Sequence, residues 1–439
     1  MIIWILNPFD ELPGEGSEGR FACISRHLAQ RGHEVTWISS DFHHRKKEKR
    51  SVECRVTSDE CAARQTLPGR FAPFRGGPRR ASTASTFDVQ CSTFDVPSYS
   101  LLLIPTPPYR SNTSLQRLAS HRVWAKRLRQ HLLEEVRSEL RPAPDLILAS
   151  TPPLEGAEAA MRLGKELGTR VVVDFMDDWP ATWLQALPSN PLIQAAGRMA
   201  LSPWFRLARR LFANADAVSA QSHTFARRAT ALGHTRPVHV CYLGGQPLPP
   251  LENAASSSFS FHLVYLGAMG RLYDLETLLR TMRLAKERGQ PWGLSLAGTD
   301  PEGRWQKRRD ELGLEDRVHF TGFLQRGELH ALLSSAHVGI VPMDPASGVA
   351  VPYKAGDYLA HGLPVISSLP GELQEMLESS GTGRFYRFGD PDDLYRVLNA
   401  VADDTNFRAL APAAAKNLFE THFNREVTYP LWAQWLESL

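Results

Sequence analysis

VPYKAGDYLAHGLPVIS, residues 351–367, is the stretch that decides how this chain folds. It predicts a short helix that opens near Pro352 and ends at Gly362, because glycine adopts the left-handed conformation found after many helices. The proline two residues later cannot continue a helix, and the apolar run 365–367 predicts a buried strand. A helix that leads directly into a buried strand is typical of a parallel α/β sheet.

Lys354 and Asp357 give this predicted helix a chemical role beyond packing. Lys354 lies in the first turn, where the helix dipole and a mobile cation both favour a bound anion. Asp357, three residues later, supplies oxygens that can accept hydrogen bonds from sugar hydroxyls. Together they suit a nucleotide-sugar site. The alternative is a surface ion pair worth roughly 0.2–0.5 kcal/mol, but the flanking residues are too apolar for a solvated helix face.

On either side of this stretch, short apolar runs alternate with helical patterns. In the first half, strands are predicted at 2–6, 35–39, 146–149 and 171–175, with helices at 20–31 and 154–167. In the second half, strands are predicted at 262–266, 293–297, 318–320, 338–342 and 365–367, with helices at 275–288, 304–312, 328–334 and from 372. This β-α-β rhythm predicts an α/β protein with two parallel sheets.

The breaks in the rhythm predict the domain boundaries. The Pro-, Gly- and Ser-rich stretch 244–258 predicts a linker between an N-terminal Rossmann-like domain, 1–247, and a C-terminal one, 259–420. A final apolar-faced helix, 421–439, could dock on either domain. Residues 43–100 carry a charge run, an Arg-rich segment and a near-repeat of STFDV, so we interpret them as an insertion with mobile parts and a short hairpin. A long amphipathic helix is predicted at 114–140.

The composition excludes several classes of protein. Of 439 residues, 43% are hydrophobic and 22% charged, which is typical of a globular protein with buried cores. No apolar run approaches the ~18–20 residues that cross a bilayer, and the short apolar N-terminus is interpreted as a first strand rather than a leader peptide. Five cysteines without a C-x-x-C spacing argue against a disulfide framework and a zinc site. We therefore expect a cytoplasmic protein without a cysteine-based metal site.

The net charge of +3 hides an asymmetry between the two halves. Residues 1–250 hold 32 Lys and Arg against 23 Asp and Glu, or +9, and the remainder holds 18 against 24, or −6. A basic first half could meet a membrane surface, a lipid-linked phosphate acceptor or a nucleic acid, or it could be an ordinary solvated surface. A peripheral contact at the inner face of the membrane therefore stays an open alternative.

Ligands of parallel α/β sheets bind beyond the carboxyl ends of the strands, so the residues that follow each strand are the first candidates. Gly16 and Ser17 lie in a glycine-rich loop after the first strand, which could approach a phosphate or could be a plain flexible loop. In the second half, Gly267 and Arg271 follow a strand, and the planar guanidinium of Arg271 could grip a phosphate. The remaining strand-end candidates, whose backbone groups could contact a base, are Gly298, Gly322 and Phe323.

Three aspartates cluster at the end of the strand 171–175. Asp174, Asp177 and Asp178 could orient an acceptor hydroxyl or act as a base. They could equally cap the helix that follows. We expect at least one of them to face a cleft.

The chain resembles the retaining glycosyltransferases of family 4, which have the GT-B fold, over nearly its whole length. The resemblance rests on the order and spacing of the glycine loop with GHEVT and the segments DFMDDWP, YLGAMGRLYDL, LAGTD, VHFTGF and PYKAGDYLAHGLPVIS. The most similar branch comprises bacterial polysaccharide transferases with an Asp-Trp-Pro segment in the first domain. This resemblance implies two Rossmann-like domains facing across a cleft, with a final helix that can cross back to the first domain.

The same resemblance assigns roles to residues of the second domain. Arg271 and Lys354 would hold the diphosphate and neutralise the leaving group, and Asp357 would bind the ribose. Gly267 lies beside them, and the base would lie along Gly298, Gly322 and Phe323. The family often has two glutamates separated by seven residues; here Asp357 replaces the second and Val349 stands eight positions before it. Sugar contacts are therefore expected from the backbone of residues 346–349, which include Ser347, Gly348 and Val349.

In the first domain, the resemblance brings Gly16 and Ser17 near the phosphates and the transferred sugar. Asp177 stands nearest to the position of the family's catalytic histidine, and we count it with Arg271 and Lys354 as catalytic. The lysine that usually follows the Gly-Arg loop is missing, and Tyr273 and Asp274 occupy its region.

These inferences predict a hexosyltransferase that moves a sugar from a nucleotide-sugar donor to an acceptor hydroxyl with retention of configuration, in bacterial glycan biosynthesis. The donor we expect first is a UDP-sugar, used as a substrate, with no cofactor and no nucleic acid. The acceptor is a glycan, a lipid-linked molecule or a small molecule. Two alternatives stay open: a nucleotide-sugar 2-epimerase of the same architecture, and a basic protein that binds nucleic acid or membranes.

Overall fold

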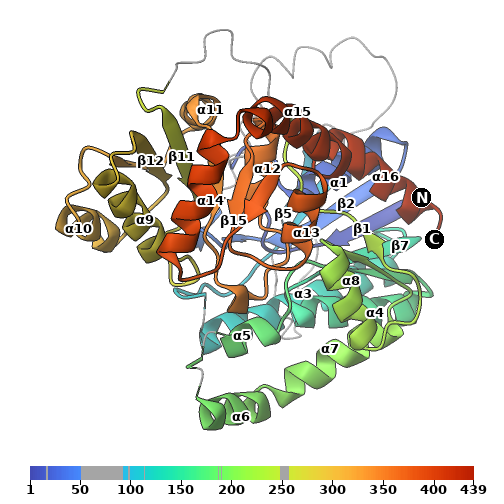
Figure 1. The fold of residues 1–439 in the computed structure, drawn as a ribbon. Helices are drawn as coiled ribbons and strands as arrows, with labels where there is room; N and C mark the ends of the chain where they lie inside the picture. Colours follow the sequence, from blue (N-terminus) through green and yellow to red (C-terminus); the bar gives the residue numbers. More distant parts are fainter. Residues whose placement is uncertain are drawn as a thin grey trace. The chain divides into compact units, whose positions relative to one another are not determined.

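The computed structural model describes residues 1–15, 18–50, 92–96, 99–112, 114–185, 187–188, 190–247 and 257–439. Within these ranges the chain forms two compact units (Figure 1). The first contains residues 1–147 and 165–169, and the second contains residues 148–164 and 170–439. The predicted domain boundaries, 1–247, 259–420 and 421–439, are not tested by this division and stay a prediction. Most of the predicted insertion, including one copy of the near-repeat, lies outside the described residues.

In the first unit, three parallel strands are adjacent in the order β1 (Ile2–Leu6), β2 (Glu34–Ser40) and β6 (Tyr99–Ile104). β5 (Ser92–Val96) pairs antiparallel with β6, so the second copy of the near-repeat is one arm of a hairpin. A shorter hairpin joins β3 (Phe42–His43) to β4 (Glu48–Lys49). The helices are α1 (Arg20–Gln30) and α3 (Leu115–Arg137), and Ser114 caps α3 by accepting from the amide of Arg117.

The second unit begins with strands in the order β7 (Leu146–Thr151), β8 (Arg170–Phe175), β9 (Ala217–Ala220) and β10 (His239–Val240). The first residues of β7 belong to the first unit. The helices between these strands are α4 (Leu154–Leu167), α5 (Ala181–Gln185), α6 (Pro191–Ala200), α7 (Ser202–Asn214) and α8 (His223–Ala231). Figure 1 shows α6 and α7 following one another along one edge of this unit.

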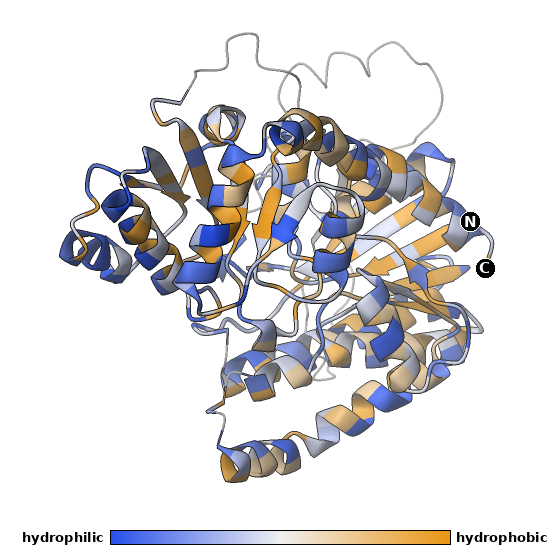
Figure 2. Ribbon diagram, in the orientation of Figure 1, coloured by the Kyte–Doolittle hydropathy of each residue, from blue (hydrophilic) through white to orange (hydrophobic). Residues whose placement is uncertain are grey.

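A second sheet in the same unit has six parallel strands in the order β13-β12-β11-β14-β15-β16. Their bounds are β11 (Phe261–Leu266), β12 (Trp292–Ala297), β13 (Val318–Gly322), β14 (Val338–Val341), β15 (Val365–Ser367) and β16 (Gly383–Phe385). The helices are α9 (Leu275–Glu287), α10 (Arg304–Glu311), α11 (Arg326–Ser335), α12 (Tyr353–Ala360), α13 (Glu372–Ser379) and α14 (Pro391–Asp403), with a 3₁₀ turn η1 (Pro345–Ser347). Figure 2 shows these strands as mainly hydrophobic and α10 as mainly hydrophilic. β11, β12, β14 and β15 are fully buried, whereas α10 has one buried residue, Trp305.

The stretch 351–367 folds as its sequence predicts. α12 ends where the amide of Gly362 donates to the carbonyl of Leu359 and the amide of Leu363 donates to the carbonyl of Tyr358, both at 2.9 Å. Gly362 has φ +71°, the left-handed conformation that this paired C-terminal cap requires. β15 follows and pairs with both β14 and β16, so the predicted buried strand is confirmed.

α12 is fixed to the second sheet through Tyr358. The Tyr358 hydroxyl accepts from the amide of Leu266 at 2.8 Å and donates to the carbonyl of Ile340 at 3.2 Å. The ring lies against Gly339, where an added Cβ would come within 2.3 Å of it. A buried tyrosine with both hydroxyl functions paired therefore sets the position of Lys354 and Asp357, which lie on the same helix.

The chain then crosses back to the first sheet through α15 (Thr405–His422) and α16 (Arg425–Glu437). The amide of Gly245 donates to the carbonyl of Phe423 at 2.9 Å, and the amide of Arg425 donates to the carbonyl of Gly245 at 3.1 Å. On α16, the Trp435 ring stacks on His239 of β10 with centroids 4.6 Å apart. The predicted final helix thus docks beside the predicted linker and the last strand of the N-terminal part.

Glu372, the first residue of α13, makes a second connection within this unit. Its carboxylate accepts from the amides of His223 and Thr224 at 2.8 and 2.6 Å and from the Tyr242 hydroxyl at 2.7 Å. These hydrogen bonds lower the pKa of Glu372 against the opposing effect of its burial. The amides are the first two of α8, so the carboxylate at the start of α13 completes the hydrogen bonding of the α8 N-terminus.

None of the helices in the described ranges has the combination of length and apolarity that a membrane crossing requires.

Candidate functional site

Three of the predicted glycines lie together at the carboxyl ends of neighbouring strands in the second sheet. Gly267 follows β11, Gly298 follows β12 and Gly322 ends β13. The Gly267 amide donates to the carbonyl of Ala297, and the Gly298 amide donates to the carbonyl of Gly322, both at 2.9 Å. All three have positive φ, and a Cβ on Gly298 would lie 2.0 Å from the Gly267 carbonyl oxygen. A wall of main chain therefore lies where ligands of such sheets bind.

Lys354 lies directly beside this wall. A Cβ on Gly267 would be 3.3 Å from the Lys354 ammonium nitrogen. The ammonium also lies 4.1 Å from the centroid of the Tyr265 ring and 3.9 Å from that of Tyr273. Within the described part of the chain, no hydrogen-bond acceptor contacts it, although the side chain is only 7% exposed. The expected mobile cation is thus a buried one, and the surface ion-pair alternative is wrong.

Burial lowers the pKa of Lys354 from 10.5 to about 7, with Asp357 acting in the opposite direction. The two ring faces also favour the ammonium, but a cation–π contact is worth about 0.5–2 kcal/mol, less than the cost of burying an unpaired charge. Lys354 is therefore poised to change charge near neutral pH. An anion placed beside Gly267 would supply the missing counter-charge and stabilise the protonated form.

Asp357 lies one turn further along α12. Water reaches its side chain, yet protein surrounds the carboxylate closely enough for burial to raise the pKa of Asp357 to about 6. Arg425 and then Lys354 oppose this effect. Gly245 lies close by, since a Cβ there would be 3.8 Å from a carboxylate oxygen of Asp357. The carboxylate is thus ionised at neutral pH and open to a hydroxyl-bearing ligand.

Arg271 is exposed in the turn between β11 and α9. This turn and the segment after β14 are tied together, because the amide of Asp344 donates to the carbonyl of Leu272 at 2.9 Å. Tyr273 forms an antiparallel bridge with Met343 in the same region. The structure therefore brings the predicted phosphate-binding turn next to the segment that leads into residues 345–349.

The loop expected to contact the sugar is ordered by its own hydrogen bonds. Asp344 accepts from the amide of Ala346 at 2.8 Å, and the Ser347 hydroxyl accepts from the amide of Val349 at 3.4 Å. Ser347 is buried and Gly348 has φ +70°. Several amides of residues 346–349 are thus engaged within the loop. Its sugar-binding role stays a prediction.

Arg228 of α8 connects this loop to the aspartate cluster. Its guanidinium donates to the carbonyl of Gly348 at 2.8 Å and lies 3.4 Å from a carboxylate oxygen of Asp178. Burial raises the pKa of Asp178, Arg228 lowers it, and the neighbouring Asp177 raises it again. Gln185 packs against Gly348, where a Cβ would come within 2.4 Å of its amide. One arginine therefore fixes the position of Gly348 relative to Asp178.

The other predicted residues are less closely associated with Lys354. Asp177 accepts from the Trp179 indole at 3.2 Å and the Thr182 hydroxyl at 2.9 Å, an arrangement that supports the start of α5. Phe323, just after β13, is 75% exposed. Gly16 and Ser17 lie outside the described residues. The catalytic role of Asp177 is untested and stays a prediction.

Sequence reasoning did not identify Arg228 or the aromatic surroundings of Lys354. Tyr265 lies inside a strand, and the sequence places Tyr273 only in the region of a missing lysine. Arg228 lies on a helix that the sequence pattern does not predict clearly, and its partner Gly348 is 120 positions away. Of these residues, only Tyr265 and Tyr273 could be related to the site from the sequence, because both flank the turn that contains Gly270 and Arg271.

Residues 15–244 match the family model for the glycosyl transferase 4-like domain, and residues 260–404 match the model for glycosyl transferases group 1. Among curated proteins, the amylovoran biosynthesis glycosyltransferase AmsK of Erwinia amylovora is 27% identical over 169 residues. The matched region is 38% of this chain and 42% of AmsK. The chain therefore spans about two fifths of the length of this relative.

Two solved structures cover the whole of this chain. Sucrose-phosphate synthase from Thermosynechococcus elongatus superposes with a TM-score of 0.69 at 15% identity, with 98% of that chain covered. Alr3699/HepE from Anabaena, solved in complex with UDP, superposes with a TM-score of 0.61 at 16% identity, with 100% of that chain covered. At these identities the likeness shows the fold, and it confirms the predicted GT-B architecture.

Proposed function

The chain belongs to the glycosyltransferase 4-like family, and on that premise we propose that it transfers a sugar from a nucleotide-sugar donor to an acceptor hydroxyl. The observation that carries this proposal is the buried ammonium of Lys354, which lacks a hydrogen-bond acceptor in the described residues and lies beside the Gly267 turn. A diphosphate is the ligand whose charge matches this position. Neither the epimerase nor the nucleic-acid alternative gains support from the matched families.

The donor's parts can be assigned to the residues around Lys354. Its diphosphate would contact Lys354, the Gly267 amide region and Arg271 in the adjoining turn. Its ribose would reach the Asp357 carboxylate, and its base would lie along Gly298 and Gly322. HepE, which shares the fold, was solved with UDP, so we propose a UDP-sugar as the donor.

In the proposed reaction, the acceptor oxygen forms a bond to the anomeric carbon while the bond from that carbon to the diphosphate breaks. We propose that both events occur on one face of the sugar, so that configuration is retained. The acceptor proton passes to the departing diphosphate oxygen. Lys354, Arg271 and the N-terminus of α12 stabilise the negative charge that develops on this leaving group, without a metal or cofactor.

The acceptor and the cellular role rest on the relatives. AmsK is named for amylovoran biosynthesis, and we propose a glycan acceptor in a bacterial polysaccharide pathway. A lipid-linked acceptor would bring the basic first half to the inner face of a membrane, where anionic lipids attract Lys and Arg. This peripheral contact is a part of the proposal that sedimentation with anionic vesicles would test.

The donor assignment can be tested by thermal-shift titration of the full chain with UDP-, GDP-, ADP- and dTDP-sugars. A ligand at 100 times its dissociation constant should stabilise the folded state by about 2.7 kcal/mol. Lys354→Ala should abolish this shift, whereas Lys307→Ala, an exposed lysine on α10, should preserve it. A full shift in the Lys354 variant would refute the diphosphate assignment. Turnover of donor without any acceptor, into an epimer, would refute transferase activity.

A further inference from the structure

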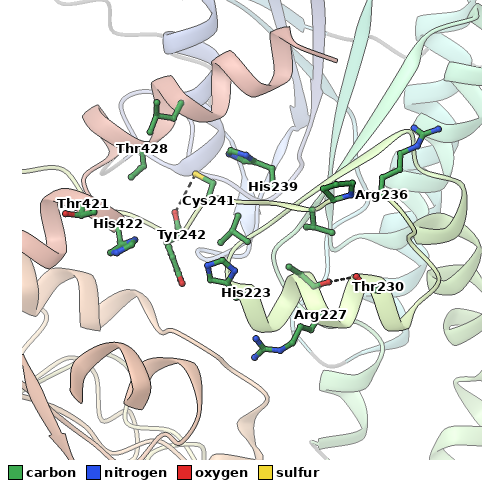
Figure 3. A pocket seen from close by; sticks show the side chains of 15 residues that line it. His223, Arg227, Thr230, Arg236, His239, Cys241, Tyr242, Thr421, His422 and Thr428 are labelled. Carbon is green, nitrogen blue, oxygen red and sulfur yellow. Dashed lines mark hydrogen bonds between the residues drawn. The ribbon is translucent and has the colours of Figure 1, made fainter. Parts of the chain in front are cut away.

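A cavity of about 610 Å³ lies in the second unit (Figure 3). Its walls come from α8, the segment leading into β10, and the region where α15 passes into α16. None of the residues assigned to the donor lines it. Its volume is within the range of small-molecule sites, about 300–1,000 Å³.

The lining of this cavity is basic. Two guanidinium groups and three imidazoles line it, and its lining includes no aspartate or glutamate. The five residues are Arg227, Arg236, His223, His239 and His422. Both arginines stay charged at any physiological pH. Cations gathered around a cavity without a carboxylate raise its potential and attract anions.

Two imidazoles lie at one end of the cavity. Figure 3 shows His223 and His422 on either side of Tyr242, and the ring centroids lie 6.2 Å and 5.8 Å from that of Tyr242. Burial lowers the pKa of His422, and the charge of His223 lowers it further. The hydroxyl of Tyr242 is committed to Glu372 behind the wall. An anion entering here would stabilise the charged form of His422.

The remaining lining suits an organic anion better than a bare inorganic one. Hydroxyl groups come from Thr230, Thr421 and Thr428. Apolar surface comes from Val238, Val240 and Leu431. A ligand with an anionic group, several hydroxyls and some apolar surface would match all three kinds of wall.

We propose that this cavity binds a sugar phosphate, as a site separate from that of the nucleotide-sugar donor. Arg227 and Arg236 supply permanent charge for the phosphate. The hydroxyls of Thr230, Thr421 and Thr428 each donate to a carbonyl of their own helix, so they are left as acceptors for hydroxyl groups of the sugar. The site lies against α8, whose Arg228 holds Gly348 and whose first amides are bound by Glu372. A bound ligand would therefore stabilise the helix that positions the sugar loop.

Isothermal titration calorimetry of the full chain with glucose 1-phosphate, and with glucose as the uncharged probe, tests this proposal. We expect saturable binding of the phosphate alone. The double variant R227A/R236A should weaken it at least tenfold, and because both arginines are exposed the fold should be kept. R206A/R209A, which removes the same charge from exposed positions of α7, should bind like the wild type.

The variant Lys354→Met distinguishes binding in this cavity from binding at the donor site. Binding that survives in Lys354→Met and is lost in R227A/R236A supports the proposal. Loss in Lys354→Met with full retention in R227A/R236A would place the ligand at the donor site and overturn it. Equal weakening in both double variants, or no binding at millimolar concentration, would also overturn it.

Discussion

Replacing Lys354 by methionine should make the folded protein more stable while removing donor binding. The pKa of Lys354 falls from 10.5 to about 7 on burial, which at 1.36 kcal/mol per pKa unit corresponds to a burial cost of about 5 kcal/mol below pH 7. The contacts with Tyr265 and Tyr273 offset about 0.5–2 kcal/mol of this. Methionine has a similar unbranched shape and packs well against aromatic rings. We expect a gain of about 3 kcal/mol at pH 6.

The pH dependence of this gain identifies its cause. Because the pKa of Lys354 is lower in the folded protein, the unfolded chain binds more protons between pH 7 and 10.5. Wild-type stability from this group therefore rises with pH across that window. The advantage of the methionine variant should shrink by about 2.7 kcal/mol between pH 7 and pH 9. Asp357, with a pKa of about 6, is mostly ionised in the wild type from pH 7 upward.

Urea denaturation of both proteins at pH 6, 7 and 9 measures these differences. Taking the difference between the two proteins at each pH cancels the shared titrating groups that do not interact with Lys354. Asp357 does interact with Lys354 and has a pKa of about 6, so the comparison between pH 7 and pH 9 carries the test. A variant less stable than the wild type at pH 6 would refute the reasoning. A stability difference that stays constant from pH 7 to pH 9 would show that Lys354 is not buried as an unpaired charge.

Three further predictions follow from the same geometry. Donor affinity, measured by calorimetry, should fall about fivefold between pH 7 and pH 8, because the protonated fraction of Lys354 falls from half to about one tenth. Lys354→Arg should remove this pH dependence. A wild-type affinity that does not change with pH would contradict the prediction. Gly298→Ala should lower the free energy of unfolding by about 2–4 kcal/mol, because its Cβ would meet a carbonyl oxygen at 2.0 Å. Gly327→Ala, in helix α11 and with nothing within 4 Å of its Cβ, should not lower urea stability and should raise it by up to about 1 kcal/mol. Arg228→Met should reduce kcat about tenfold with donor affinity preserved, since it frees the Gly348 loop; a change in affinity alone would argue against a positioning role.

The sequence predicted the second sheet well because its signals are local. The strands 262–266, 293–297 and 365–367 are apolar runs bounded by glycine, proline or polar residues, and each lies within a residue of the observed strand. The turn at Gly362 follows from its need for a positive φ. The region 176–244 gave weaker signals, because β9 has four residues and the helices α6 and α7 are largely exposed.

The sequence points to the candidate site only through chemistry that is local. Glycines at strand ends and a lysine in the first turn of a helix are visible in a short window. The burial of Lys354 between Tyr265 and Tyr273 depends on the packing of α12 on the sheet, which a sequence pattern does not contain. The link from Arg228 to Gly348 joins residues 120 positions apart. Long-range contacts of this kind decide whether a charge is solvated or buried, and therefore its pKa.

The Glu372 connection bears on how this chain can be divided for expression. A fragment ending at the predicted boundary near 247 would contain α8 and Tyr242 but would lack the carboxylate that binds them. Three donors would then lose their acceptor: the amides of His223 and Thr224 and the Tyr242 hydroxyl. Each donor that stays buried and unsatisfied costs about 1–3 kcal/mol. During synthesis, the N-terminus of α8 likewise stays incomplete until residue 372 has left the ribosome.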